Sequence, residues 1–176
     1  MSDLRNWLEQ LGDKIPGYSG YSARERRRDA DKEQRERLAD RLRAAKEPLN
    51  EAVRRLSSSG RLMSVGPADR LLKKIDGAEN RVRFASYGYA GFFDAARIDE
   101  PQLDALYQFD HALIEAVEEI ARLAGEYRDK IADESYLPTA LEGAVDKFNH
   151  TFDERHRAVE NFRPQGDAPG QPMFGV

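Results

Sequence analysis

Apolar residues recur along most of the chain at alternating intervals of four and three, the spacing of one buried face on an α-helix. The clearest run is formed by Leu38, Leu42, Ala45, Leu49, Ala52 and Leu56. This run predicts a long helix from Ser22 to Ser58, in which Pro48 produces a kink because it removes only one backbone hydrogen bond. The small residues from Ser57 to Gly60 are the predicted end of this helix.

The same spacing predicts three further long helices. They are expected at residues 67–97, 99–132 and 138–162. The register continues through Gly77, Gly88 and Gly91, each of which costs only about 1 kcal/mol relative to alanine. Residues 67–97 are therefore expected to form one helix that starts at Gly66-Pro67.

The predicted fold is all-α, an antiparallel up-down four-helix bundle of long helices, because the links between the long helices are short. A single domain is expected over residues 1–162, with a short helix (2–14) and a Gly/Tyr loop in residues 1–21 and the long helices in residues 22–162. Residues 163–176 contain three prolines, three glycines and no periodicity, and are predicted to be a disordered tail.

Composition narrows the class of protein. The chain has 176 residues, of which 40% are hydrophobic and 34% charged, as expected for a helical bundle with a charged surface. No apolar run approaches the roughly 18 residues that cross a bilayer, and no signal peptide is recognisable. There is no cysteine, which excludes disulfides and thiolate chemistry, and a cytoplasmic location is expected.

The net charge of −4 hides an asymmetry between the two halves of the chain. Residues 24–61 contain 13 basic and 8 acidic side chains, whereas residues 94–160 contain 7 basic and 17 acidic ones. Two explanations stay open at this point. Either the two halves lie side by side and neutralise each other, or the basic segment is presented to an anionic partner.

The most informative segment for function is residues 24–37, in which Ala30 is the only apolar residue. A helix that is polar on all sides must be stabilised by its own ion pairs or must contact a partner. The arginines that we assign to a candidate partner-binding surface are Arg24, Arg26, Arg27, Arg28 and Arg35. Alternating acidic side chains and a pI near 5.5 argue against nucleic acid, and the lack of an apolar face argues against membrane insertion.

Two short segments, residues 17–21 and 88–92, share the pattern Gly-Tyr-small-Gly-aromatic. Counting residues along antiparallel helices places both at the end of the bundle that carries the arginine-rich segment. The aromatic side chains that we add to the candidate surface are Tyr18, Tyr21, Tyr87, Tyr89 and Phe92. Aromatic and arginine side chains stack favourably and are enriched in protein interfaces. The alternative is an aromatic cluster that seals this end of the bundle.

A second candidate site lies inside the predicted bundle. The same counting brings Asp110, at a core position, within a turn of His156, with Arg155 near the rim of that layer. One interpretation is a mononuclear iron, manganese or zinc site made of Asp110, His150, Asp153 and His156. The other is a buried polar pair that fixes the register of the helices.

No nucleotide-binding, hydrolase or metalloprotease motif occurs in the chain. We therefore expect a non-enzymatic interaction or assembly protein that binds a protein partner, with self-association as the simplest case, and that needs no cofactor. Two alternatives remain. One is a metal-binding protein or oxidoreductase based on Asp110 and His156, and the other is a nucleic-acid-associated protein.

Overall fold

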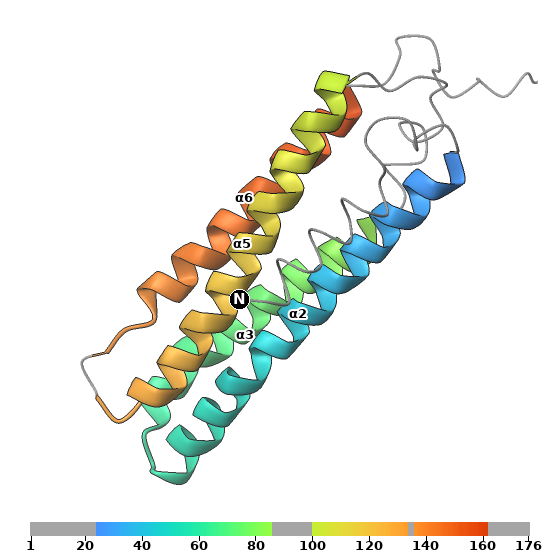
Figure 1. The fold of residues 1–176 in the computed structure, drawn as a ribbon. Coiled ribbons are helices and arrows are strands. Elements are labelled where there is room, and N and C mark those ends of the chain that lie inside the picture. Colours follow the sequence, from blue (N-terminus) through green and yellow to red (C-terminus); the bar gives the residue numbers. More distant parts are fainter. Residues whose placement is uncertain (1–23, 86–99, 134–135, 162–176) are drawn as a thin grey trace, which may run out of the picture.

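The computed structural model describes residues 24–85, 100–133 and 136–161, and the regular elements of this part of the chain are all helices joined by short links. Its four helices are α2 (Arg24–Ser58), α3 (Leu62–Arg83), α5 (Glu100–Lys130) and α6 (Thr139–Asn161). They lie side by side as four rods (Figure 1). The predicted all-α class is confirmed, whereas the predicted helix at 2–14 and the tail at 163–176 lie outside the described residues.

The core lies where the predicted apolar stripes meet. Leu42, Leu49 and Ala52 on α2 have no exposed surface, and neither do Ile75 on α3 or Val117 on α5. Helix α6 contributes Leu141, Val145 and Phe148 to the same cluster. Burying such side chains stabilises the fold by about 1.5–3 kcal/mol each, which explains why long amphipathic helices adopt this arrangement.

Ion pairs between helices give the direction of each neighbour. Helix α2 packs against both α3 and α5, and α6 packs against α5 and touches α3. Arg41 pairs with Glu118, and further along both helices Glu51 pairs with Arg128, so α2 and α5 point the same way.

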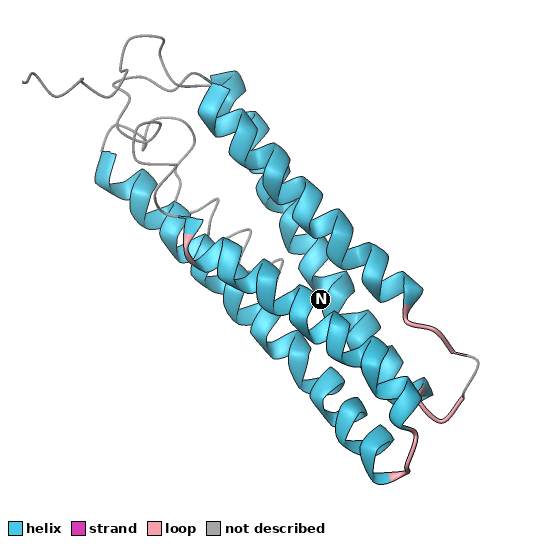
Figure 2. Ribbon diagram, turned by 180° about the vertical axis from the view of Figure 1, so that it is seen from behind, coloured by secondary structure: helices cyan, strands magenta, loops and turns pink. Residues whose placement is uncertain are grey.

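Other pairs show the directions of α3. Arg83 pairs with Asp40 at 3.0 Å, and Lys46, further along α2, pairs with Glu79, which precedes Arg83 on α3. Helix α3 therefore runs opposite to α2. Lys74 pairs with Asp146, and Arg81 with Asp153, so α3 and α6 point the same way. The bundle therefore consists of two helical hairpins laid side by side (Figure 2). This differs from a simple ring in which every neighbour is antiparallel.

The end of α2 agrees with the prediction, and the bounds of α3 do not. Gly60 has a φ of +76°, and the backbone N–H of Arg61 donates to the carbonyl of Leu56, which closes α2. Helix α3 then begins at Leu62, so Pro67 lies inside it rather than at its start. It ends at Arg83, not at residue 97, because Phe84 leaves the helical region with φ −103° and ψ 9°. Residues 86–99 lie outside the described part.

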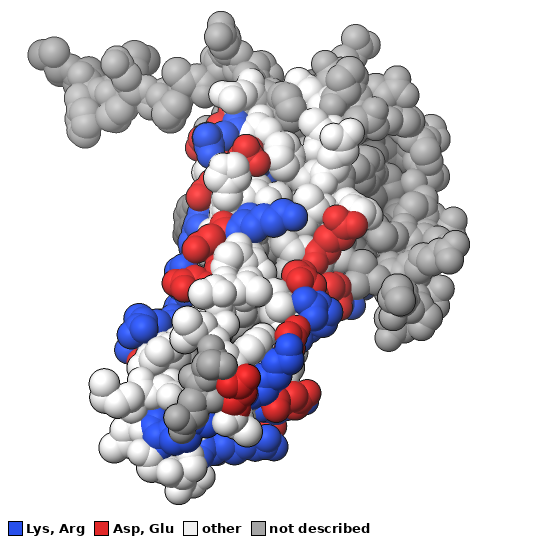
Figure 3. Space-filling model, turned by 90° about the vertical axis from the view of Figure 1, so that its left-hand side faces the viewer, with Lys and Arg blue, Asp and Glu red and all other residues white. Residues whose placement is uncertain are grey.

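The basic and acidic halves of the chain lie against each other in the described part, which supports the first explanation of the charge asymmetry. Figure 3 shows Lys and Arg side chains interleaved with Asp and Glu along one face. In the residues that the structure describes, no helix has both the length and the apolar character needed to span a membrane.

Candidate functional site: a buried charge layer

The apolar stripe of α2 continues toward the N-terminus as charged residues. Asp31 and Arg35 precede Leu38 with the same alternating spacing, and both are buried. The polar pattern of this stretch predicts solvation on all sides, and that expectation is wrong for Asp31, Gln34 and Arg35, all of which are buried. The physical reason is that a charged side chain occupies a core position when the neighbouring helices supply opposite charges.

Arg155 on α6 supplies one of these charges. Its residue surface is only 3% exposed. Its Nη2 donates to Oδ1 of Asp31 at 2.9 Å, and its Nε donates to Oδ1 of Asp110 on α5 at 2.6 Å. Arg35 completes the group, because its Nε donates to the second oxygen of Asp31 at 2.9 Å. We call Asp31, Arg35, Asp110 and Arg155 the charge layer.

The charge layer ties three helices together at one level of the bundle. Asp31 and Arg35 come from α2, Asp110 from α5 and Arg155 from α6. Two carboxylates and two guanidiniums leave it without net charge, which is the condition under which buried ions are tolerated. Arg155 is the central member because it bonds a carboxylate on each of two other helices.

Burial raises the pKa of Asp110 above its ordinary value. The positive charge and hydrogen bond of Arg155 act in the opposite direction, and the negative charge of Asp31 adds to the effect of burial. The amide of Gln34 lies close enough to favour the ionised form, although its nitrogen makes no well-formed hydrogen bond. Asp110 is thus easier to protonate than an exposed aspartate.

The residues predicted for a metal site are not brought together. The basic group that bonds Asp110 is Arg155, and the Nε2 of His156 lies 3.3 Å from Glu160 on its own helix. His150 pairs with Glu154 at 3.4 Å, also on α6, and Asp153 pairs with Arg81 on α3. Among the described residues, no three His, Cys, Asp or Glu side chains are placed so that they could hold a metal ion.

One of the arginines predicted for the candidate partner surface does not belong to it. Arg35 is buried in the charge layer and is therefore not presented to a partner. The backbone of Arg24, Arg26, Arg27 and Arg28 belongs to α2. The aromatic members of the predicted surface lie outside the described residues: Tyr18, Tyr21, Tyr87, Tyr89 and Phe92.

The apolar pattern does not reveal Asp31 as a core residue and places Arg155 only at the rim. The spacing of the sequence does identify them as core positions, because each residue continues the apolar stripe of its helix at the same intervals as the leucines and phenylalanines. A search for apolar residues alone passes over charged residues at core positions.

The charge layer can hold helices in register, but it offers no nucleophile paired with a base. No protein-family model matches the chain, and no match was found among curated proteins or solved structures. The role of the charge layer is therefore argued from its own geometry.

Proposed function

We propose that the chain is a non-enzymatic interaction or assembly protein that binds a protein partner through the N-terminal end of α2. A second copy of the chain is the simplest partner. The observation that supports this proposal is that α2 continues outward from the buried charge layer to Arg24, through a segment that contains four arginines and one alanine. A helical end of this composition has few apolar side chains to bury, so it is stabilised either by its own ion pairs or by a partner, and we propose the partner.

The charge layer has a defined part in this proposal. Buried ion pairs add little net stability compared with apolar residues, but they specify which helices meet and in which register. Here the layer would hold the base of the arginine-rich end in one position. The finer architecture that we propose with it is an up-down run of four long helices, with a short N-terminal helix packed near this end.

Sedimentation equilibrium of the full chain tests the self-association version. The test variant replaces Arg26, Arg27 and Arg28 with Gln. The matched control replaces Arg43, Arg54 and Arg55 with Gln, because these exposed side chains lie further along the same helix and the change in charge is equal. We expect wild type and control to dimerise equally, and the test variant to dimerise at least about tenfold more weakly, since arginines are frequent hot spots of interfaces.

Equal dimerisation of all three proteins would contradict the proposed surface. If the wild type is a monomer, the same three proteins are compared in affinity purification from cell lysate. Failure to recover a partner whose binding depends on Arg26, Arg27 and Arg28 would then reject the proposal as a whole. Nothing in the described residues favours the metal-binding or the nucleic-acid alternative over it.

A further inference from the structure

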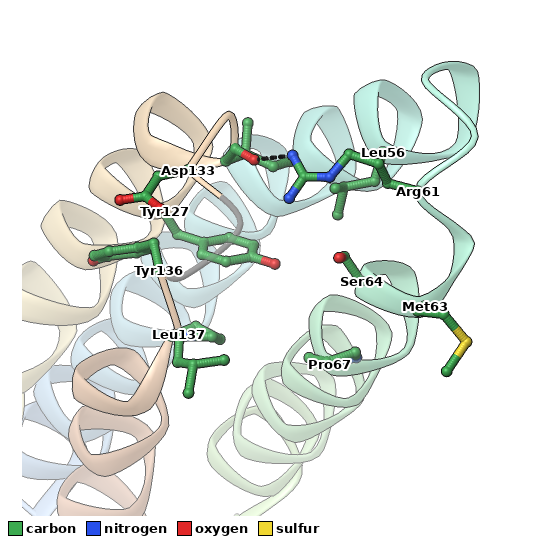
Figure 4. Close-up of a pocket in the computed structure, with 11 residues that line it drawn as sticks. Leu56, Arg61, Met63, Ser64, Pro67, Tyr127, Asp133, Tyr136 and Leu137 are labelled. Carbon is green, nitrogen blue, oxygen red and sulfur yellow. Dashed lines mark hydrogen bonds between the residues drawn. The ribbon is translucent and has the colours of Figure 1, made fainter.

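The end of the bundle that lies opposite to the N-terminal end of α2 contains a cavity of about 180 Å³. This cavity lies between the start of α3 and the link from α5 to α6 (Figure 4). Its apolar walls include Leu56, Pro67, Ile131 and Leu137. An apolar cavity of roughly 150 Å³ is large enough for benzene in other proteins, so this one accommodates a single ring or a short branched chain.

The hydroxyl group of one buried side chain opens onto this cavity. Tyr127 is only 4% exposed as a whole residue, its hydroxyl borders the cavity, and this hydroxyl makes no hydrogen bond in the described part of the chain. Figure 4 shows this hydroxyl directed into the space toward Ser64, whose hydroxyl borders the same cavity. The hydroxyl oxygen is reached from the cavity rather than enclosed by protein, so a polar atom of a ligand in the cavity can form a hydrogen bond with it.

The surroundings of this hydroxyl favour a negatively charged group. Helix α3 begins beside it, and the N-cap Arg61 makes no side-chain capping bond. No acidic residue lies in the first turn of α3, so the helix itself supplies no negative charge at the positive end of its dipole. Arg61 also extends its guanidinium across the cavity to donate to the carbonyl of Ile131, which adds a positive charge. Asp133 lines the rim, but its carboxylate points away from the hydroxyl of Tyr127.

We propose that this cavity is a binding site for a small monocarboxylic acid with an apolar body. The apolar body lies between Leu56, Pro67 and Leu137, and the carboxylate accepts hydrogen bonds from the hydroxyl groups of Tyr127 and Ser64. A tyrosine hydroxyl is protonated at neutral pH and can donate, and burial raises the pKa of Tyr127 further in the same direction. The site is independent of the proposed partner surface, since the two lie at opposite ends of the bundle.

Benzoate is a suitable probe, because it combines one ring with one carboxylate. We expect titration of the full chain with sodium benzoate to shift the NMR signals of Tyr127 and Leu137. Benzyl alcohol, which has the same ring but no charge, should bind at least about tenfold more weakly, since hydrogen bonds to charged groups are stronger. Equal binding of the two compounds would overturn the assignment to carboxylates, and no binding of benzoate at 10 mM, roughly the weakest affinity of interest, would overturn the site.

A pair of tyrosine variants locates the site. Tyr127→Phe removes only the unpartnered hydroxyl, and benzoate should then bind about tenfold more weakly. Tyr136→Phe is the matched control, because the hydroxyl of Tyr136 bonds Glu126 at 3.3 Å while its ring also lines the cavity. Equal loss in both variants, or none in Tyr127→Phe, would contradict the proposal. If Tyr127→Phe fails to fold, transferred magnetisation between benzoate and Pro67 in the wild type decides the location.

Discussion

The Nε atom of Arg155 lies 2.6 Å from Oδ1 of Asp110, and each residue occupies a position where the stripe of its helix otherwise presents an apolar side chain. The same guanidinium reaches Asp31 on a third helix. The bundle thus combines the contribution of one layer of ion-paired side chains with that of a core of buried apolar side chains. These two contributions respond differently to mutation, which allows them to be separated.

Replacing Arg155 alone should destabilise the protein strongly. Arg155→Met keeps much of the side-chain volume but leaves the partly buried carboxylate of Asp110 without its basic partner and the buried carboxylate of Asp31 with Arg35 alone. We expect the free energy of unfolding to fall by about 3–5 kcal/mol, the usual cost of an uncompensated buried charge. Urea denaturation followed by circular dichroism measures this loss.

Replacing the whole charge layer should have a much smaller effect. The combined variant Asp31→Leu, Arg35→Leu, Asp110→Leu and Arg155→Met removes every charge together, and such replacements are often neutral or stabilising by about 1–4 kcal/mol. A combined variant as unstable as Arg155→Met would show that the ion pairs themselves stabilise the fold. If the layer fixes register, as we propose, this variant should also show broader NMR signals for α6 than the wild type.

The contribution of Asp110 to stability should depend on pH. Its pKa is raised in the folded protein, so the folded state binds the proton more tightly than the unfolded state does. This contribution is complete below the unfolded pKa of about 3.9 and is lost as pH rises through the folded pKa. The unfolding free energy of wild type minus that of Asp110→Asn should therefore decrease from about pH 4 toward neutrality and then level off.

Urea denaturation of both proteins at a series of pH values measures this difference, and effects of other carboxylates cancel because they are shared. A difference that increases with pH would mean that the attraction of Arg155 outweighs burial. In that case Asp110 would be a conventional ion-paired carboxylate.

The sequence predicted the helices well where burial is purely apolar. The run from Leu38 to Leu56 forms the buried face of α2, and α5 and α6 begin and end close to the expected residues. Periodicity alone did not reveal that α3 ends at Arg83, since a stripe of apolar residues records which face is buried and not where the backbone leaves the helix. It also could not identify Tyr127 as a cavity residue, because the free hydroxyl depends on how two separate links approach each other.

The apolar core can be compared with the exposed apolar end of the bundle by the same substitution at two positions. Leu49 has no exposed surface, whereas Leu62 is 69% exposed. Leu49→Ala should lower the free energy of unfolding by about 2–5 kcal/mol, since it removes buried methyl groups and leaves a cavity. Leu62→Ala should change it by less than about 0.5 kcal/mol. Thermal and urea denaturation measure both, and a large loss for Leu62→Ala would show that this side chain is covered in solution.

Alanine substitutions at two glycines distinguish the effect of backbone strain from the effect of helix propensity. Gly60 has a φ of +76° in the turn between α2 and α3, and a Cβ atom added there would meet nothing within 4 Å. Gly60→Ala should therefore be destabilising by about 1–2 kcal/mol through the backbone alone.

Gly77 lies inside α3, and a Cβ atom there also meets nothing within 4 Å. Gly77→Ala should stabilise the protein by about 0.5–1 kcal/mol, because alanine restricts the unfolded chain and favours the helix. Urea denaturation should give opposite signs for the two variants, and a destabilising Gly77→Ala would indicate that a partner or another segment approaches α3 closely at this position.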